Sequence, residues 1–441
     1  MSLAHDRERS GFRNRNYQLQ YYSSAMALLW EKSLLTSYKD GHLSDVALVN
    51  GKVLVTSYLI NKRTKVYYFY VQYMDRSGNW MGNPMMIDSL AADKIDENNK
   101  PGIIASPNNA FMAFSYFMVS RENKTQASRI VVMDTTLEII YRKIVDIPYP
   151  TDFYNPLASL ITNQGSFFIL GIHYTTEKRV KEPDQSFYEL YGYNILLDRF
   201  VNRSIKGGNK FLTDVGMTAD GLNRSIVVAG FYSEKTTYST GGVFYYSLTE
   251  DSLHETRTVH TPFSNDYLQK FLGERKESKE LVNYSIDRLI VRKDGGVAIV
   301  AESMYQSTRS YFDYYMQSYI SHYYYHFGNI MVLSVNPDGQ ILWNNIISKD
   351  QNSIDDSGYL SSYYLAVTGG QLVAIYNKYI EEESSVLVTY VEPTGNQMTD
   401  VVCNELEKVK IIPRSAKQID DETVLMPAFR QNKFYIIQLT F

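Results

Sequence analysis

Hydrophobic residues in this chain occur in short runs of β-branched and aromatic residues, many alternating with polar ones, and turn residues bound each run. Such runs predict strands, because successive side chains of a strand point to opposite faces of a sheet. Helical periodicity is almost absent. Representative strands are expected at 66–74, 166–174, 224–232, 296–303 and 433–441.

Turn pairs follow these strands at a nearly constant interval and divide the chain into repeats. Asn50-Gly51 and Asp294-Gly295 are examples, and such pairs supply the positive φ that tight hairpins need. Two long intervals, of 74 and 75 residues, each contain one insertion, at 264–283 and 306–326. Without the insertions the unit is about 55 residues long and occurs seven times.

A unit of this length with four strands is typical of a β-propeller blade. We therefore predict an all-β fold, a seven-bladed β-propeller formed by residues 1–441 as a single domain. In the first blade, strands are expected at 44–49, 52–59, 65–75 and 80–87.

The two ends of the chain indicate how such a ring would close. The last unit, 416–441, contains three strands, and the segment 26–35 (MALLWEKSLL) parallels the outer strand at 340–348 (QILWNNIIS). We predict that an N-terminal strand in 26–35 completes the C-terminal blade, which removes exposed strand edges. Two stacked β-sandwiches are the alternative, but they predict neither the shared repeat nor the split last unit.

Composition excludes several classes of protein and partner. Hydrophobic residues make up 44% of the 441 residues, and the net charge is −4, so neither a disordered chain nor a nucleic-acid partner is expected. No run reaches the ~18 apolar residues that a membrane span needs. Cys403 is the single cysteine, which excludes an intrachain disulfide.

One repeat carries a motif found in known propellers. Asp338, Gly339 and Trp343 form Asp-Gly-x-x-x-Trp, which resembles the repeats of pyrroloquinoline-quinone-type propellers and related Bacteroidetes envelope proteins, as does the content of 38 Tyr. The resemblance transfers no quinone-binding residue and no cofactor. It implies a periplasmic, cell-surface or extracellular protein. The polar start of the chain shows no signal peptide, although its Met-Ser-Leu opening is compatible with a replaced one.

Motifs for catalysis are missing from the sequence. It contains no GxxxxGK[ST] or GxGxxG phosphate loop and no GxSxG nucleophile elbow. A non-enzymatic binding or scaffold protein is therefore the leading hypothesis. The alternative is a carbohydrate-active enzyme whose paired carboxylates come from different blades and meet in the propeller channel.

The insertion within 305–327 is the main candidate binding element, because it contains eight Tyr and two Phe in 23 residues. Exposed aromatic rings stack on sugars or anchor protein partners. It joins the second and third strands of its blade, so it should share a face with the helix-like insertion 264–283 and the connection 175–190. The alternative is a structural cap. The contact candidates are Tyr311, Phe312, Tyr314, Tyr315 and Tyr319, whereas Tyr323, Tyr324 and Tyr325 should run into the following strand.

Two histidines in the same insertion raise the question of a metal. His322 and His326 are four residues apart, a spacing that would place both imidazoles on one face of a helix. The sequence offers no third ligand, so we expect a ligand-contacting role and no metal site.

Overall fold

The structure, a computed structural model, shows an all-β chain that divides into two compact units. Unit 1 comprises residues 1–208, 224–226 and 248–254, and unit 2 comprises 209–223, 227–247 and 255–441. The residues that the structure describes are 2–5, 17–23, 27–33, 41–91, 102–120, 125–179, 181–183, 185–272, 280–380, 384–431 and 433–441.

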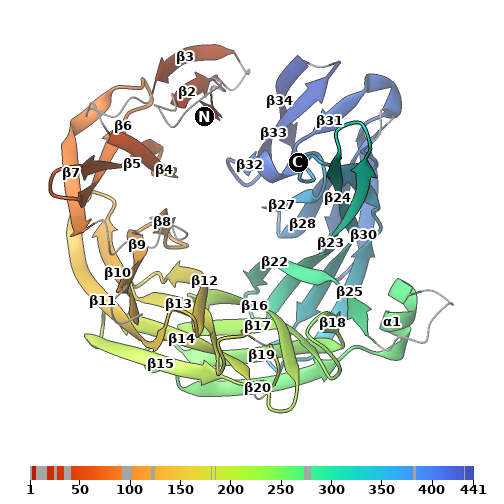
Figure 1. The fold of residues 1–441 in the computed structure, drawn as a ribbon, viewed down its shortest axis with the longest axis horizontal. Coiled ribbons are helices and arrows are strands. Elements are labelled where there is room, and N and C mark those ends of the chain that lie inside the picture. Colours follow the sequence, from red (N-terminus) through yellow and green to blue (C-terminus); the bar gives the residue numbers. More distant parts are fainter. Residues whose placement is uncertain are drawn as a thin grey trace. The chain divides into compact units, whose positions relative to one another are not determined.

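Unit 1 contains a three-stranded N-terminal sheet and three four-stranded antiparallel sheets (Figure 1). The N-terminal sheet consists of β1 (Ser2–His5), β2 (Tyr17–Tyr22) and β3 (Leu28–Ser33). The others consist of β4 (Gly41–Val49), β5 (Lys52–Asn61), β6 (Val66–Met74) and β7 (Trp80–Ala91); β8 (Gly102–Ala105), β9 (Phe111–Ser120), β10 (Thr125–Asp134) and β11 (Ile139–Pro150); and β12 (Tyr154–Ile161), β13 (Phe167–Tyr174), β14 (Ser186–Asn194) and β15 (Arg199–Ile205).

Unit 2 continues the same arrangement of sheets. Its first sheet, of which a few residues belong to unit 1, consists of β16 (Phe211–Asp220), β17 (Ser225–Ser233), β19 (Gly242–Thr249) and β20 (Glu255–Pro262). The next sheet consists of β22 (Tyr284–Val291), β23 (Val297–Asp313), β24 (Ser318–Val335) and β25 (Ile341–Ile347), with β26 (Gln351–Ile354) paired to β24. The sheet after it consists of β27 (Tyr363–Thr368), β28 (Gln371–Asn377), β29 (Val386–Val391) and β30 (Gln397–Cys403).

The first four-stranded sheet confirms the strand pattern predicted for the repeat. Its four strands occupy the expected segments, with neighbouring strands paired in sequence order. Asn50 and Gly51 join β4 to β5 with φ values of 48° and 72°, the conformation for which Asn-Gly is favoured in two-residue hairpins.

Hydrophobic side chains pack between successive sheets, and alternation along each strand divides them between two cores. On β9, Met112 and Phe114 pack toward the preceding sheet, whereas Ala113 packs toward the following one. On β10, Val131 packs toward the preceding sheet and Val132 toward the following one. A strand buried on both faces explains why the sequence reads as continuous apolar runs rather than strict alternation.

The C-terminal sheet is three strands wide, as predicted, but its first strand is interrupted. Two short strands, β31 (Val409–Ile411) and β32 (Lys417–Gln418), pair with opposite ends of β33 (Thr423–Arg430), and the 3₁₀ turn η3 (Pro413–Ser415) lies between them. The last strand, β34 (Lys433–Thr440), pairs with the other edge of β33.

The described part of 26–35 forms β3, and the partner of β3 in the structure is β2. The predicted pairing of this segment with the C-terminal strands is therefore not confirmed. The sequence comparison of 26–35 with 340–348 could not reveal β2, because it did not include residues 17–22.

The two insertions adopt different structures. The segment 264–283 begins with helix α1 (Asn265–Leu272), as predicted; Leu268 is buried and Phe271 packs against the same core. After the helix, β21 (Leu281–Val282) pairs with β18 (Ser239–Thr240), and residues 273–279 lie outside the described part. No helix in the described residues is long and apolar enough to cross a membrane.

Candidate functional site

The insertion 306–326 lengthens two neighbouring strands into a projecting hairpin. In the core of their sheet, β23 and β24 pair up to the partners Glu302 and Ile330. The pairing resumes at Met304 with Phe327 and continues to Asp313 with Ser318. We call residues 304–327 the aromatic arm. A β-bulge separates it from the core pairs, and bulges bend a strand and increase its twist.

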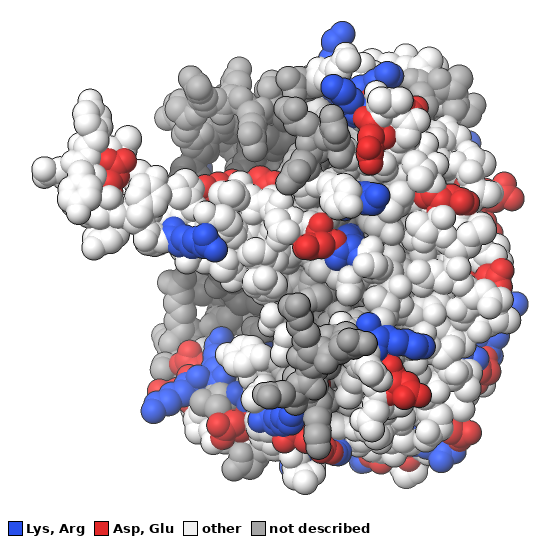
Figure 2. All heavy atoms as spheres, turned by 90° about the vertical axis from the view of Figure 1, so that its right-hand side faces the viewer, with Lys and Arg blue, Asp and Glu red and all other residues white. Residues whose placement is uncertain are grey.

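Aromatic side chains dominate the tip of the aromatic arm. Tyr314, Tyr315 and Tyr319 are 87%, 96% and 74% exposed, and Tyr311 and Phe312 are also exposed. Phe312 lies edge-on to Tyr314 and Tyr319, with ring centroids 5.2 and 5.3 Å apart. Figure 2 shows the arm as the narrow projection at the left, where uncharged residues predominate. The structure thus places all five predicted contact residues at the surface, and their binding role stays a prediction.

The two histidines do not have the geometry that their spacing suggested. The expectation of a helix face was wrong, because His322 and His326 lie on strand β24. Four residues along a strand separate their Cα atoms by about 13 Å, too far for one metal ion to bind both imidazoles. Each histidine has its own neighbour: His322 Nδ1 lies 2.6 Å from Asp355 Oδ2, and His326 Nδ1 lies 2.5 Å from Asn352 Oδ1.

These contacts brace the base of the aromatic arm. β26 pairs with Tyr324–Phe327 of β24, and the Tyr323 backbone N–H donates to Asp355. That bond and His322 lower the pKa of Asp355, so its carboxylate stays ionised. His326 also stacks on Tyr305 at 4.3 Å. The histidines are therefore structural contacts of the arm in this structure, and β24 contains the three tyrosines predicted to run into it.

A polar cavity of about 370 Å³ lies beside the base of the aromatic arm, wholly within unit 2. Residues of β22 and β23 form one side, and the start of β27 and the η3 turn form the other. Its lining residues are Ser285, Asp287, Arg288, Glu302, Met304, Ser362, Tyr363, Tyr364, Leu365, Pro413, Arg414, Ala416 and Lys417.

Asp287 reaches this cavity because its strand is irregular. The pairing of β22 with β23 skips from Ile286 to Arg288, so Asp287 occupies a β-bulge. Asp287 Oδ2 accepts a 2.7 Å hydrogen bond from the Tyr363 hydroxyl. The cavity walls shield the Asp287 carboxyl from water and raise its pKa to about 6, although the residue keeps an exposed surface; the nearby carboxylates of Glu302 and Asp214 contribute less. Burial and Asp287 raise the pKa of Tyr363 well above its usual range, so its phenol remains a donor.

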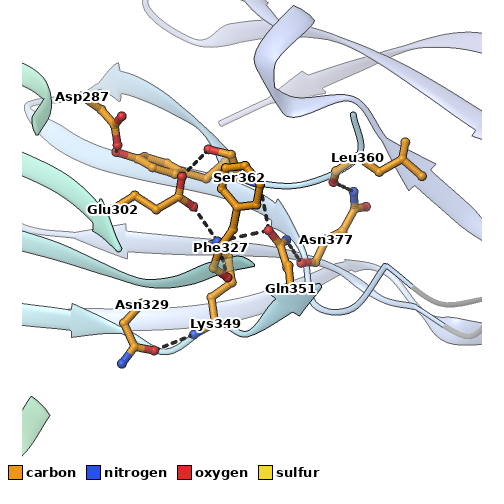
Figure 3. Close-up of polar contacts among 10 residues, drawn as sticks. Asp287, Glu302, Phe327, Asn329, Lys349, Gln351, Leu360, Ser362 and Asn377 are labelled. Atoms are coloured by element: carbon orange, nitrogen blue, oxygen red, sulfur yellow. Dashed lines mark hydrogen bonds and ion pairs between the residues drawn. The ribbon is translucent and has the colours of Figure 1, made fainter. Parts of the chain in front are cut away.

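A buried ion pair holds Glu302, one of the residues that line the cavity (Figure 3). Lys349 Nζ lies 2.5 Å from Glu302 Oε1, and their side chains are 0% and 5% exposed. Ser362 Oγ donates to Glu302 Oε2 at 2.7 Å, and Gln351 Oε1 accepts from Lys349 Nζ and from the Ser362 backbone N–H. Gln351 Nε2 in turn donates to the Asn377 carbonyl. This network fixes Glu302 and Ser362 in place.

The cavity carboxylates differ from those expected for the enzyme alternative. Asp287 and Glu302 come from neighbouring strands of one sheet, not from different blades, and Glu302 is neutralised by Lys349. Sequence reasoning missed the cavity because none of its residues forms a motif. The available signal was the adjacent pair Asp287-Arg288, which interrupts the apolar pattern of a strand at the point of the bulge.

No protein-family model matches the chain, and no curated protein matches it. Solved structures give broad likenesses. One is the β-propeller domain of the Trilobed protease from Pyrococcus furiosus, with 12% identity and a TM-score of 0.39 over 92% of this chain and 94% of that one. Another is the WD40 domain of SCAP from fission yeast, with 8% identity and a TM-score of 0.40 over 97% of this chain and 87% of that one. A prolyl endopeptidase is similar at 10% identity and a TM-score of 0.41. The match covers 95% of this chain but only 53% of the endopeptidase.

Proposed function

We propose that the sheets form a seven-bladed propeller closed by β3, which would be the outer strand of the C-terminal blade. The support comes from a contact that recurs between an outer strand and the next sheet. In unit 2, Trp343 Nε1 of β25 donates to the Pro393 carbonyl and Asn345 Nδ2 to the Gly395 carbonyl, both in the turn between β29 and β30.

The N-terminal strand makes the same contact inside unit 1. Trp30 Nε1 of β3 donates to the Arg76 carbonyl at 2.9 Å, and Lys32 Nζ donates to the Gly78 carbonyl at 2.6 Å. These acceptors lie in the turn between β6 and β7. β3 contacts the sheet β4–β7 in the same way that β25 contacts the sheet β27–β30. This similarity supports the proposal that β3 is the outer strand of a blade that closes the ring.

Glycine is needed at this contact. Gly78 and Gly395 have φ values of +75° and +91°, and a Cβ atom at either would come within 3.0 Å of the ring of Trp30 or Trp343. The shared turn and the shared tryptophan explain physically why 26–35 and 340–348 resemble each other.

We propose that this protein is a non-enzymatic binding or scaffold protein of a bacterial envelope or the extracellular space. The observation that carries the proposal is the aromatic arm, which presents Tyr314, Tyr315 and Tyr319 to solvent beyond a braced base. Exposed aromatic clusters of this kind suit a protein or a glycan partner. The alternative, a carbohydrate-active enzyme, has weaker support, because only Asp287 of the cavity carboxylates lacks a cation at ion-pair distance among the described residues.

The binding proposal is tested by replacing Tyr314, Tyr315 and Tyr319 with Ala. Glycan arrays and co-purification from the native host identify the partner, and the triple variant should bind it more weakly by about 2 kcal/mol or more, roughly 30-fold. The matched control replaces Tyr238 and Tyr379, exposed tyrosines outside the arm, with Ala. A triple variant that binds like the native chain but has a much lower melting temperature would show that the arm is a structural cap.

A further inference from the structure

The cavity beside the aromatic arm has the size and rigidity of a small-molecule site. Its volume of about 370 Å³ lies at the lower end of the range for ligand pockets. Lys349 and Gln351 hold two of its lining residues, Glu302 and Ser362, so these polar groups are positioned before any ligand arrives. Buried ion pairs contribute little net stability, which makes a purely stabilising role a poor explanation of this network.

Positive charge predominates in the part of the cavity that faces solvent. Lys349 neutralises Glu302, which leaves Asp287 as the remaining acid of the lining, with Asp214 behind it on the Ser285 hydroxyl, against three exposed cations, Arg288, Arg414 and Lys417. None of these three has an acidic side chain at ion-pair distance among the described residues. The Arg414 guanidinium is held at 4.7 Å over the Phe327 ring, a geometry that leaves its edges available for a bidentate contact with an anion.

Asp287 adds a different kind of recognition. Its Oδ2 atom accepts from the Tyr363 hydroxyl, and its Oδ1 atom has no hydrogen-bond donor among the described residues. Tyr363 is almost fully buried and fixes the carboxylate in the bulge. The free oxygen is suited to accept a ligand hydroxyl. Tyr364, whose hydroxyl oxygen accepts from the Gln418 backbone N–H at 2.6 Å, supplies a fixed ring to the wall.

We propose that this cavity binds a small organic anion that also carries hydroxyl groups, with a sugar acid as the class that satisfies both features. The ligand carboxylate is paired with Arg288 and Arg414, and a ligand hydroxyl donates to Asp287. This inference is independent of the role proposed for the aromatic arm, because the recognising groups, Asp287, Arg288 and Arg414, lie outside the arm.

Titration calorimetry on the full chain tests the proposal with D-glucuronate as the probe. D-Glucose lacks the carboxylate and acetate lacks the hydroxyls, so each should bind at least about tenfold more weakly than glucuronate. A methyl glucuronide distinguishes two sources of the ligand. If it binds as tightly as glucuronate, the site accepts a residue of a longer glycan; if it binds more weakly, the site accepts the free acid. Equal binding of glucose, or of acetate, overturns the proposal, and so does no binding of glucuronate at millimolar concentration.

Variants locate the binding within the cavity. Arg288→Gln and Asp287→Asn should each weaken glucuronate binding about tenfold, and neither removes a contact of the Glu302–Lys349 network. Lys293→Gln is the matched control, because Lys293 is an exposed cation of the β22–β23 turn. Arg414→Gln serves as a further test if its melting temperature is native. Unchanged affinity in both Arg288→Gln and Asp287→Asn would overturn the proposal, whereas the arm triple variant should bind glucuronate normally.

Discussion

Lys349 and Glu302 are buried charges that depend on each other. With side chains 0% and 5% exposed, neither has water to replace a lost partner. We expect Lys349→Met to lower the free energy of unfolding by about 3–5 kcal/mol, because it leaves the Glu302 carboxylate uncompensated. Urea denaturation measures this. The double variant Glu302→Gln/Lys349→Met should recover part of the loss, and a double variant no more stable than the single one would contradict the explanation.

Asp287 makes stability depend on pH in the direction opposite to most carboxylates. Its pKa of about 6 lies above the ordinary value of 3.8, so the folded state binds the proton more tightly than the unfolded state. Its contribution to stability is complete below pH 3.8 and is lost as the pH rises through 6. Asp287→Asn keeps an acceptor for Tyr363 without the charge. Thermal unfolding should show that this variant is more stable than the native chain at pH 7.5, and that the difference shrinks toward pH 4. An equal difference at both pH values would contradict this prediction.

At the scale of the element, β3 shows how one side chain attaches a strand to a neighbouring sheet. Trp30 donates to the Arg76 carbonyl, covers Gly78 and packs against the core that includes Leu19 and Val53. Because the indole is half-buried, Trp30→Ala should lower the free energy of unfolding by about 2 kcal/mol, less than for a fully buried tryptophan. The matched control is Leu29→Ala, at a neighbouring position that is 56% exposed, which should change it by less than about 0.5 kcal/mol. Equal effects in a chemical denaturation series would show that β3 is not attached through Trp30.

How far the sequence predicts an element depends on where its determinants lie. The first four-stranded sheet was predicted closely, because Asn50-Gly51 and the alternating runs are local signals. The spacing of His322 and His326 was misread as helical, since a spacing of four residues also keeps side chains on one face of a strand. The Asp287 cavity could not be predicted, because it depends on a bulge and on residues more than 70 positions apart, such as Tyr363.

For the whole molecule, the decisive question is whether the first and last strands pair. β34 pairs with β33 along one edge, and β3 pairs with β2. If β3 completes the C-terminal blade, deleting residues 1–36 removes the partner of β34. Hydrogen exchange should then show strongly reduced protection of amides in 433–440, together with a lower melting temperature, because an unpaired edge exposes backbone donors and acceptors. The amides of β28 serve as the internal reference. Unchanged protection of β34 in the truncated chain would contradict closure by β3.

The aromatic arm lengthens two strands whose other ends are fixed in the core of their sheet. Side chains alternate along both strands, so removing two residues from each keeps every remaining ring on its own face, whereas removing one from each exchanges the faces. Each two-residue step changes the reach of the arm by about 7 Å. The distance from the sheet to the tip of the arm is therefore adjustable, by evolution or by design, in increments that leave the packed strands unaltered.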